Sequence, residues 1–103
     1  EKLALAYQLD GKIAAQWGTH THVQTADEQI LPNGTGYLTD LGMTGPVRSV
    51  IGVRPEQSIA NFRGELTSRY EVAPGPCMLT GAVFTYDAAA KRCTGAERVR
   101  ILD

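Results

Sequence analysis

The sequence lacks the features that mark membrane proteins, exported precursors and proteins that bind polyanions. No apolar run approaches the roughly 20 residues that a membrane-spanning helix needs. No basic segment followed by an apolar core stands near the N-terminus, so no signal peptide is visible. The formal net charge is only −1, which gives little attraction to bulk DNA or to an anionic membrane. We therefore expect neither of these as a partner.

Cysteine is also scarce, because Cys77 and Cys93 are the only two. They flank a predicted hairpin whose turn lies near residues 87–92, with Cys93 opposite about Tyr86 and Cys77 near the far end. At about 3.4 Å per residue the two are tens of ångströms apart, whereas a disulfide needs Cα atoms within about 7 Å. No C-x-x-C pair or Cys/His cluster surrounds either residue. We expect two reduced thiols in a cytoplasmic protein.

The 103 residues, 43% of them apolar and 20% charged, fit one small globular domain. The first residue is Glu1, and a helical pattern begins at once with no capping residue ahead of it. We therefore expect the native chain to continue upstream.

Local patterns predict a mixed, strand-rich α/β class with two helices. The predicted helices cover residues 2–9, closed by Asp10-Gly11, and 55–63, with Ile59 and Phe62 as an apolar stripe. Residues 41–46 hold two glycines and a proline, so we expect no regular structure there. The expected strands are residues 13–17 (buried), 29–31, 36–40, 49–53 (extended), 68–72, 78–86 and about 94–101, the last two as a hairpin. Val99-Arg100-Ile101 alternates as a half-solvated strand should.

His20 and His22 are the only histidines, and they stand two residues apart directly after the predicted strand 13–17. In extended backbone, residues i and i+2 point to the same side, about 6.5–7 Å apart. Two such imidazoles can converge on one metal, or hold two metals about 3.5–4 Å apart. Sites in α/β proteins also assemble beyond the carboxyl ends of strands. We therefore expect both side chains to point into one shared pocket there.

The pattern alone leaves another interpretation open, namely a surface loop with two solvated histidines. Two ligands do not complete a site, because a catalytic zinc needs three and a dinuclear centre needs more. Asp27 and Asp40 could contribute oxygen ligands. Each is equally explained as a loop residue that caps backbone donors.

Two motifs resemble a known family. Gly18-Thr19-His20-Thr21-His22-Val23-Gln24-Thr25-Ala26-Asp27 is followed by Ile30-Leu31-Pro32 and then by Thr39-Asp40-Leu41-Gly42-Met43-Thr44-Gly45-Pro46. In this order and at this separation they are similar to the YmdB-type bacterial metallophosphoesterases of the calcineurin-like superfamily. Members of this family are associated with 2′,3′-cyclic nucleotide phosphodiesterase activity.

The resemblance implies that residues 1–103 form the C-terminal portion of a single domain, a four-layer αββα sandwich. It implies two divalent metal ions (Fe, Mn or Mg), with His20 on one and His22 on the other, and Thr21 directed away from them. A hydroxide held between the metals would attack phosphorus. The substrate would be a small cyclic nucleotide or another phosphoester. Thr44, Gly45 and Arg48 are candidates for substrate binding, and homo-oligomerisation stays open.

The family's other ligands, which are an N-terminal Asp, a bridging carboxylate, an Asn followed by His, and a further His, match no position in this sequence. No catalytic proton donor is identified either. Two alternatives therefore stay open: a non-catalytic fragment or assembly module with at most a structural metal, and a Cys/His nucleophile system using Cys77 with His22.

Overall fold

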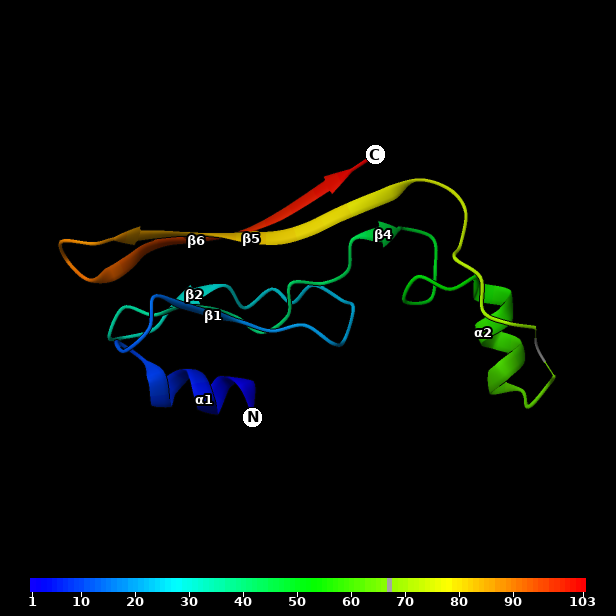
Figure 1. Ribbon diagram of the computed structural model, residues 1–103, viewed down its shortest axis with the longest axis horizontal. Coiled ribbons are helices and arrows are strands. Elements are labelled where there is room, and N and C mark those ends of the chain that lie inside the picture. Colours follow the sequence, from blue (N-terminus) through cyan, green and yellow to red (C-terminus); the bar gives the residue numbers. More distant parts are fainter. Residues whose placement is uncertain (67) are drawn as a thin grey trace.

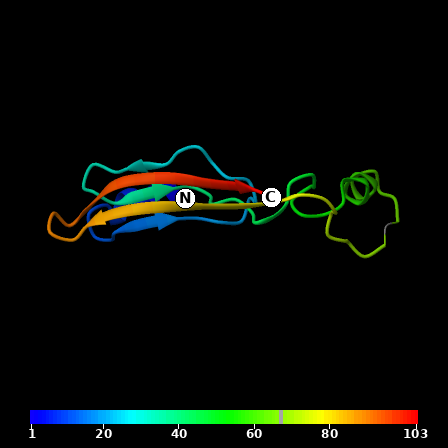
Figure 2. The same ribbon diagram turned by 90° about the horizontal axis from the view of Figure 1, so that it is seen from above.

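The protein is described by a computed structural model that covers residues 1–66 and 68–103. It is a mixed α/β chain with two helices and two small sheets. Figure 1 shows α1 on one side of the first sheet and the β5–β6 hairpin on the other, while α2 projects away from both sheets. Seen from above, the hairpin overlies the strands of the first sheet (Figure 2). The elements are α1 (Lys2–Leu9), β1 (Ala15–Trp17), β2 (Gln29–Ile30), β3 (Gly36–Leu38), β4 (Gly45–Pro46), α2 (Pro55–Phe62), β5 (Cys77–Asp87) and β6 (Arg92–Leu102).

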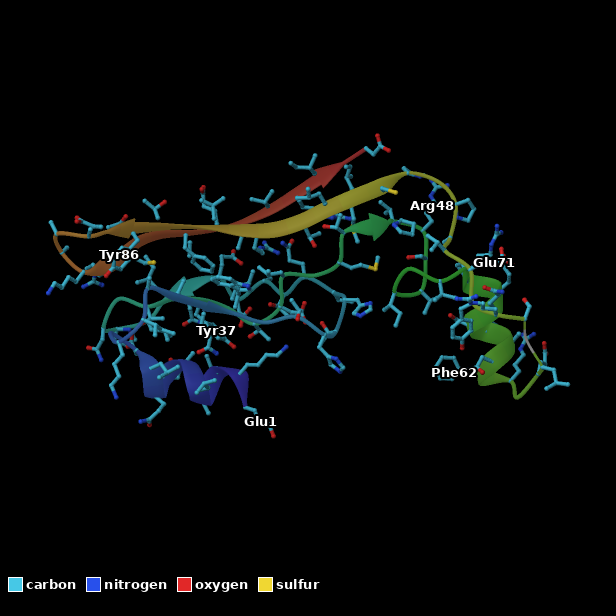
Figure 3. All side chains as sticks on the ribbon, viewed as in Figure 1. Glu1, Tyr37, Arg48, Phe62, Glu71 and Tyr86 are labelled. Atoms are coloured by element: carbon cyan, nitrogen blue, oxygen red, sulfur yellow. The ribbon has the colours of Figure 1, made fainter. Side chains whose placement is uncertain are left out.

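The first sheet has the order β1-β3-β2, with β1 parallel and β2 antiparallel to the central β3. All three residues of β3 are buried, and Tyr37 forms an apolar cluster with Ala6 of α1 and Leu31. Figure 3 shows Tyr37 on the side of the sheet that faces α1. Because β1 and β3 are parallel, the loops that follow them leave the sheet at the same edge.

The second sheet confirms the predicted hairpin. β5 and β6 pair antiparallel from Met78↔Leu102 to Asp87↔Arg92, with an irregularity between Thr85 and Tyr86. Tyr86 lies opposite Cys93, as expected, and both cysteines are free thiols. The buried Cys93 sulfur donates to the Ala14 carbonyl at 3.2 Å, so the hairpin contacts the first sheet closely. A Cβ at Gly36 would lie 2.6 Å from the Phe84 ring, so only glycine permits this approach.

Two expectations about the edges of the sheets were wrong. The strand predicted at residues 13–17 begins only at Ala15 and is not buried, since 54% of Trp17 is exposed. Within the described residues, β1 is an edge strand that pairs only with β3. Its Trp17 stacks on Phe84 with ring centroids 6.1 Å apart, which covers one face of the indole. Residues 41–46 do contain regular structure, because Gly45 and Pro46 pair with Met78 and Cys77 of β5.

Two further expectations between residues 49 and 72 were also wrong. Residues 49–53 form a turn rather than an extended segment, with Ile51 and Gly52 at positive φ and Val50 and Val53 exchanging hydrogen bonds. Residues 68–72 form no strand and contribute one isolated bridge, Val53↔Val72. The apolar stripe of α2 is not buried: 88% of Phe62 is exposed, and Ser58 is the buried residue of the helix (Figure 3).

The chain is more open than a compact domain of its length. Its radius of gyration is 17.4 Å, whereas about 13 Å is typical of 100 residues. Its accessible surface is 6900 Å², against about 5,700 Å² for a compact protein of this mass. Leu79, Val83 and Ile101 are about half exposed, and their alternate positions place them on the outer face of the hairpin. No helix among the described residues is long and apolar enough to span a membrane.

This outer face predicts self-association of the isolated chain. Light scattering coupled to gel filtration should show species larger than the 11.1 kDa monomer. Val83→Thr and Ile101→Thr should reduce the association, because each removes exposed apolar area. Glu97→Thr is the control, since Glu97 pairs with Val83 on the same face and is already polar. A monodisperse monomer of the unmodified chain would contradict the prediction.

Candidate metal-binding loop

Two loops meet at the edge of the first sheet where β1 and β3 end. The histidine loop (residues 18–25) follows β1, and the glycine loop (residues 39–44) follows β3. The Leu41 amide donates to the Gly18 carbonyl at 2.9 Å, and the Thr25 amide donates to the Asp40 carbonyl at 3.2 Å. The backbones of the two loops are therefore tied together along their length, although about 20 residues separate them in the chain.

The side chain of Asp40 fixes the middle of the histidine loop. Its carboxylate is 0% exposed. One oxygen, Oδ2, accepts from the Thr21 amide at 2.9 Å and from the Thr21 hydroxyl at 2.7 Å. The other oxygen, Oδ1, accepts from the Gly42 amide at 2.8 Å. Lys2 Nζ lies 3.7 Å from Oδ2 and also donates to the Thr19 carbonyl at 2.7 Å. Thr21, the exposed residue between the two histidines, is thereby anchored to a buried carboxylate.

The charge state of Asp40 follows from these contacts. Burial by itself raises the pKa of a carboxyl group. Here the hydrogen bonds from the Gly42 amide and from Thr21, together with the charge of Lys2, outweigh burial and lower the pKa of Asp40 below its ordinary value of 3.8. The carboxylate is therefore ionised at neutral pH, with its donors in place.

Both histidines have unusual backbone conformations, with φ of 109° at His20 and 66° at His22. The expectation of an extended backbone at these two residues was therefore wrong. Non-glycine residues at positive φ are uncommon, and such strain concentrates at functional sites. The anchored Thr21 lies between them, so its hydrogen bonds to Asp40 help to hold the strained conformation.

The imidazoles themselves are exposed. His22 Nδ1 lies 3.4 Å from the carbonyl of Ile51, in the turn at residues 50–53. When that nitrogen carries the proton, Nε2 keeps its lone pair for a metal, which is how metal-binding histidines are usually oriented. His22 lines a cavity of about 380 Å³, but His20 is not among the residues that line it. The structure thus places both histidines on one loop and assigns only His22 to this cavity.

The carboxylate of Asp27 accepts hydrogen bonds from residues of the loops. It accepts from the Thr39 amide at 3.1 Å, from the Thr39 hydroxyl, and from the Thr25 hydroxyl at 2.7 Å. Although burial raises the pKa of Asp27, these hydrogen bonds outweigh burial and lower the pKa below 3.8. Asp27 and Asp40 thus cap hydrogen-bond donors of the loops, which is the second of the two roles considered for them from the sequence. Among the described residues, no three His, Cys, Asp or Glu side chains come together as a metal site.

The three candidate substrate residues lie on or beside β4. Thr44 and Arg48 are exposed, and Gly45 pairs with Met78. Arg48 is labelled near β4 in Figure 3. Thr44 and Gly45 line a second cavity, shared with Cys77 and Tyr70, rather than the one beside His22. Their role in substrate binding stays a prediction. Because Cys77 and His22 line different cavities, the geometry does not favour a Cys/His nucleophile pair.

Sequence reasoning missed two features of the site. Nothing in residues 50–53 signalled that the Ile51 carbonyl would face His22, because that contact depends on how the turn packs. The alternation in Val99-Arg100-Ile101 was recognised, but the sequence did not show which of these side chains faces the first sheet. Arg100 lines the cavity beside His22, while the apolar Ile101 lies on the outer face of the hairpin.

Comparisons with known proteins give one consistent family. A family model described as "YmdB-like protein" matches residues 1–99. A Bacillus subtilis protein named 2′,3′-cyclic-nucleotide 2′-phosphodiesterase is 48% identical over 103 residues, covering 100% of this chain and 39% of that protein. A crystal structure of a Mycoplasma pneumoniae phosphatase superposes with a TM-score of 0.90 at 41% identity, over 98% of this chain and 36% of the other. A hypothetical protein from Thermus thermophilus gives a TM-score of 0.90 at 36% identity, over 100% and 40%. The chain thus spans about two fifths of these relatives.

The buried carboxylate predicts a specific pH dependence. Because the pKa of Asp40 is lowered in the folded state, its stabilisation is complete above the unfolded value of about 3.9 and is lost as the pH falls through the folded value. Asp40→Asn should lower the free energy of unfolding by about 1–3 kcal/mol at pH 7, since its NH₂ group would face donors. It should also flatten the loss of stability below about pH 4.

Urea unfolding of the full-length protein at several pH values measures both effects. Asp87→Asn is the matched control, because Asp87 only caps the exposed hairpin turn. Equal unfolding curves for wild type and Asp40→Asn at pH 7 would contradict the assigned role.

Proposed function

The chain belongs to the YmdB-like family, and on that premise we propose that it is part of a metal-dependent phosphoesterase that hydrolyses phosphodiester bonds. The substrate class follows from the name of the Bacillus subtilis relative, so the proposed substrates are 2′,3′-cyclic nucleotides. The activity belongs to a protein as long as the relatives, of which this chain spans about two fifths.

His20 and His22 are the proposed metal ligands. The observation that carries this assignment is the strained, Asp40-anchored loop that presents both imidazoles to solvent, with His22 Nδ1 facing a carbonyl and Nε2 left for a metal. The proposal includes two divalent ions, His20 on one and His22 on the other. When bound, such ions lower the pKa of a water and neutralise charge on phosphoryl oxygens.

The donor set fits part of such a centre. Two imidazoles suit iron better than magnesium or manganese, which prefer oxygen ligands. Asp27 and Asp40 keep their oxygens on loop donors, so the remaining oxygen ligands must come from outside the described residues. The role of this chain is to hold two nitrogen donors in place, which reduces the reorganisation needed on metal binding.

The wider context is proposed on the same premise. The helix α1, the first sheet and the hairpin form three layers, and the apolar outer face of the hairpin is suited to a fourth, as in an αββα sandwich. Two free thiols suit a cytoplasmic protein. Homo-oligomerisation, proposed on the same premise, would cover the exposed Ile59 and Phe62 of α2.

The first test removes the ligands one at a time. In the full-length protein, His20→Ala and His22→Ala should each lose bound metal and at least about 100-fold in hydrolysis of 2′,3′-cyclic nucleotides, since ligands are worth that much or more. The fold should survive, because both side chains are exposed. Metal content is measured by mass spectrometry and folding by circular dichroism. Unchanged metal content and turnover in both variants would mean that neither histidine is a metal ligand.

The second test concerns the chain alone. Residues 1–103 with added Mn²⁺ should show little or no hydrolysis of a 2′,3′-cyclic nucleotide, because two imidazoles cannot hold two hard cations tightly. The full-length enzyme, assayed at the same molar concentration, is the positive control. Comparable specific activity of the two would mean that this chain holds a complete site.

A further inference from the structure

The cavity beside His22 has features of a binding site that the metal-binding proposal does not use. Its volume of about 380 Å³ falls within the range of small-molecule pockets. It lies between the histidine loop and the inner face of the hairpin, with further walls from the segment that follows β3. The proposed metal ligand His22 is one of its lining residues, so a phosphoester at that metal would have the cavity next to it.

One wall of the cavity carries two arginines with different environments. Arg98 and Arg100 are two residues apart on β6, opposite Ala82 and Thr80, and therefore share the inner face. Arg98 is already paired, since its Nε lies 2.8 Å from Glu28 Oε2. Within the described part of the chain, no carboxylate lies within 4.0 Å of the Arg100 guanidinium. Arg100 therefore offers its donors to whatever occupies the cavity.

Thr80 provides a second unused group. Its hydroxyl oxygen is buried and has no hydrogen-bond partner among the described residues, and Thr80 faces Arg100 across the hairpin. An unsatisfied buried hydroxyl costs roughly 1–3 kcal/mol, so such groups in native proteins call for an explanation. A ligand with acceptor atoms would satisfy both groups at once.

The rest of the cavity suits a flat, apolar group. Met43 and Met78 line it together with Val47 and Ile51. Methionine side chains are flexible and polarisable, and their sulfur atoms make favourable contacts with aromatic rings. The cavity thus combines thioethers that can pack on a ring with donors that can bind its polar edge.

We propose that this cavity is the nucleoside subsite of the enzyme, in which Met43 and Met78 pack against the base and Arg100 with Thr80 hydrogen-bonds its acceptor atoms. The inference rests on the proposed phosphodiesterase function and adds a substrate-recognition role for residues that are not metal ligands. Recognition of acceptors on a base edge by a guanidinium is well established physical chemistry. Arg100 is thus a specificity-determining residue.

The test compares two substrates in the full-length enzyme. Arg100→Met and Thr80→Val should each raise KM for a 2′,3′-cyclic nucleotide, about tenfold for Arg100→Met, because a charge-assisted hydrogen bond is lost. Hydrolysis of ethylene glycol cyclic phosphate, a cyclic phosphodiester with no base or other aromatic ring, should change less than about twofold. Arg92→Met is the matched control: it changes the same strand beside the hairpin turn, away from the cavity.

Thr80→Val also separates recognition from folding. A hydroxyl that served only the fold would leave the variant less stable, whereas removing an unsatisfied hydroxyl should leave stability unchanged or higher. Equal losses on both substrates, or unchanged KM values in both variants, would overturn the subsite.

A binding measurement keeps this test independent of catalysis. Calorimetric titration of metal-free protein with a nucleoside 3′-monophosphate should give weaker binding to Arg100→Met than to wild type. If wild type binds the nucleotide but hydrolyses neither substrate, the subsite stands and the proposed function fails. If wild type does not bind the nucleotide, or Arg100→Met binds it equally well, the subsite is wrong whatever the activity.

Discussion

The arrangement of the candidate site depends on one buried carboxylate. A charge without solvent is stable only when donors surround it, and Asp40 takes its donors from two different loops and a third element. Thr21 comes from the histidine loop, Gly42 from the glycine loop and Lys2 from α1. Satisfying this one group therefore fixes the relative positions of three segments that would otherwise move independently. The positions of His20 and His22 therefore follow from how the carboxylate of Asp40 is hydrogen-bonded.

Sheet topology brings those segments within reach. Because β1 and β3 are parallel neighbours, the loops after them leave the same edge, and short backbone hydrogen bonds can join them. Close approach of the hairpin completes the arrangement. A Cβ at Gly42 would lie 2.7 Å from the Thr80 hydroxyl and 2.9 Å from the Gln24 amide, so the absence of a side chain there lets three segments converge. The same convergence forms one side of the cavity beside His22.

The sequence was most informative where structure is decided locally. The helix at residues 2–9 and the hairpin of β5 and β6 follow from periodicity and turn residues. The histidine pair was noticed from its spacing, and the family resemblance supplied its interpretation. The predictions were wrong where contacts between residues far apart in the sequence determine the local structure. The turn at residues 50–53 and the isolated bridge at Val72 could not be recognised, because the hydrogen bonds that define them depend on tertiary packing.

Burial and side-chain direction were equally hard to predict. An apolar run such as residues 13–17 suggests a buried strand, yet β1 lies at the edge of its sheet and Trp17 is covered on one face only. Alternation along β6 fixes which residues share a face, but it does not say which face meets the first sheet. That choice places Arg100 in the cavity, and it comes from the packing of Phe84 and Cys93 against β1 and its neighbours.

The positive φ values of His20 and His22 have a consequence for how these positions would change under selection. Glycine adopts such angles without strain and asparagine does so more readily than most residues, whereas histidine tolerates them at some cost. In a library randomised at both positions and sorted only for expression and solubility, glycine and asparagine should therefore accumulate. A library sorted for turnover should instead retain histidine. The amino acids recovered from the two sorts would measure separately what the backbone prefers at this loop and what the chemistry requires.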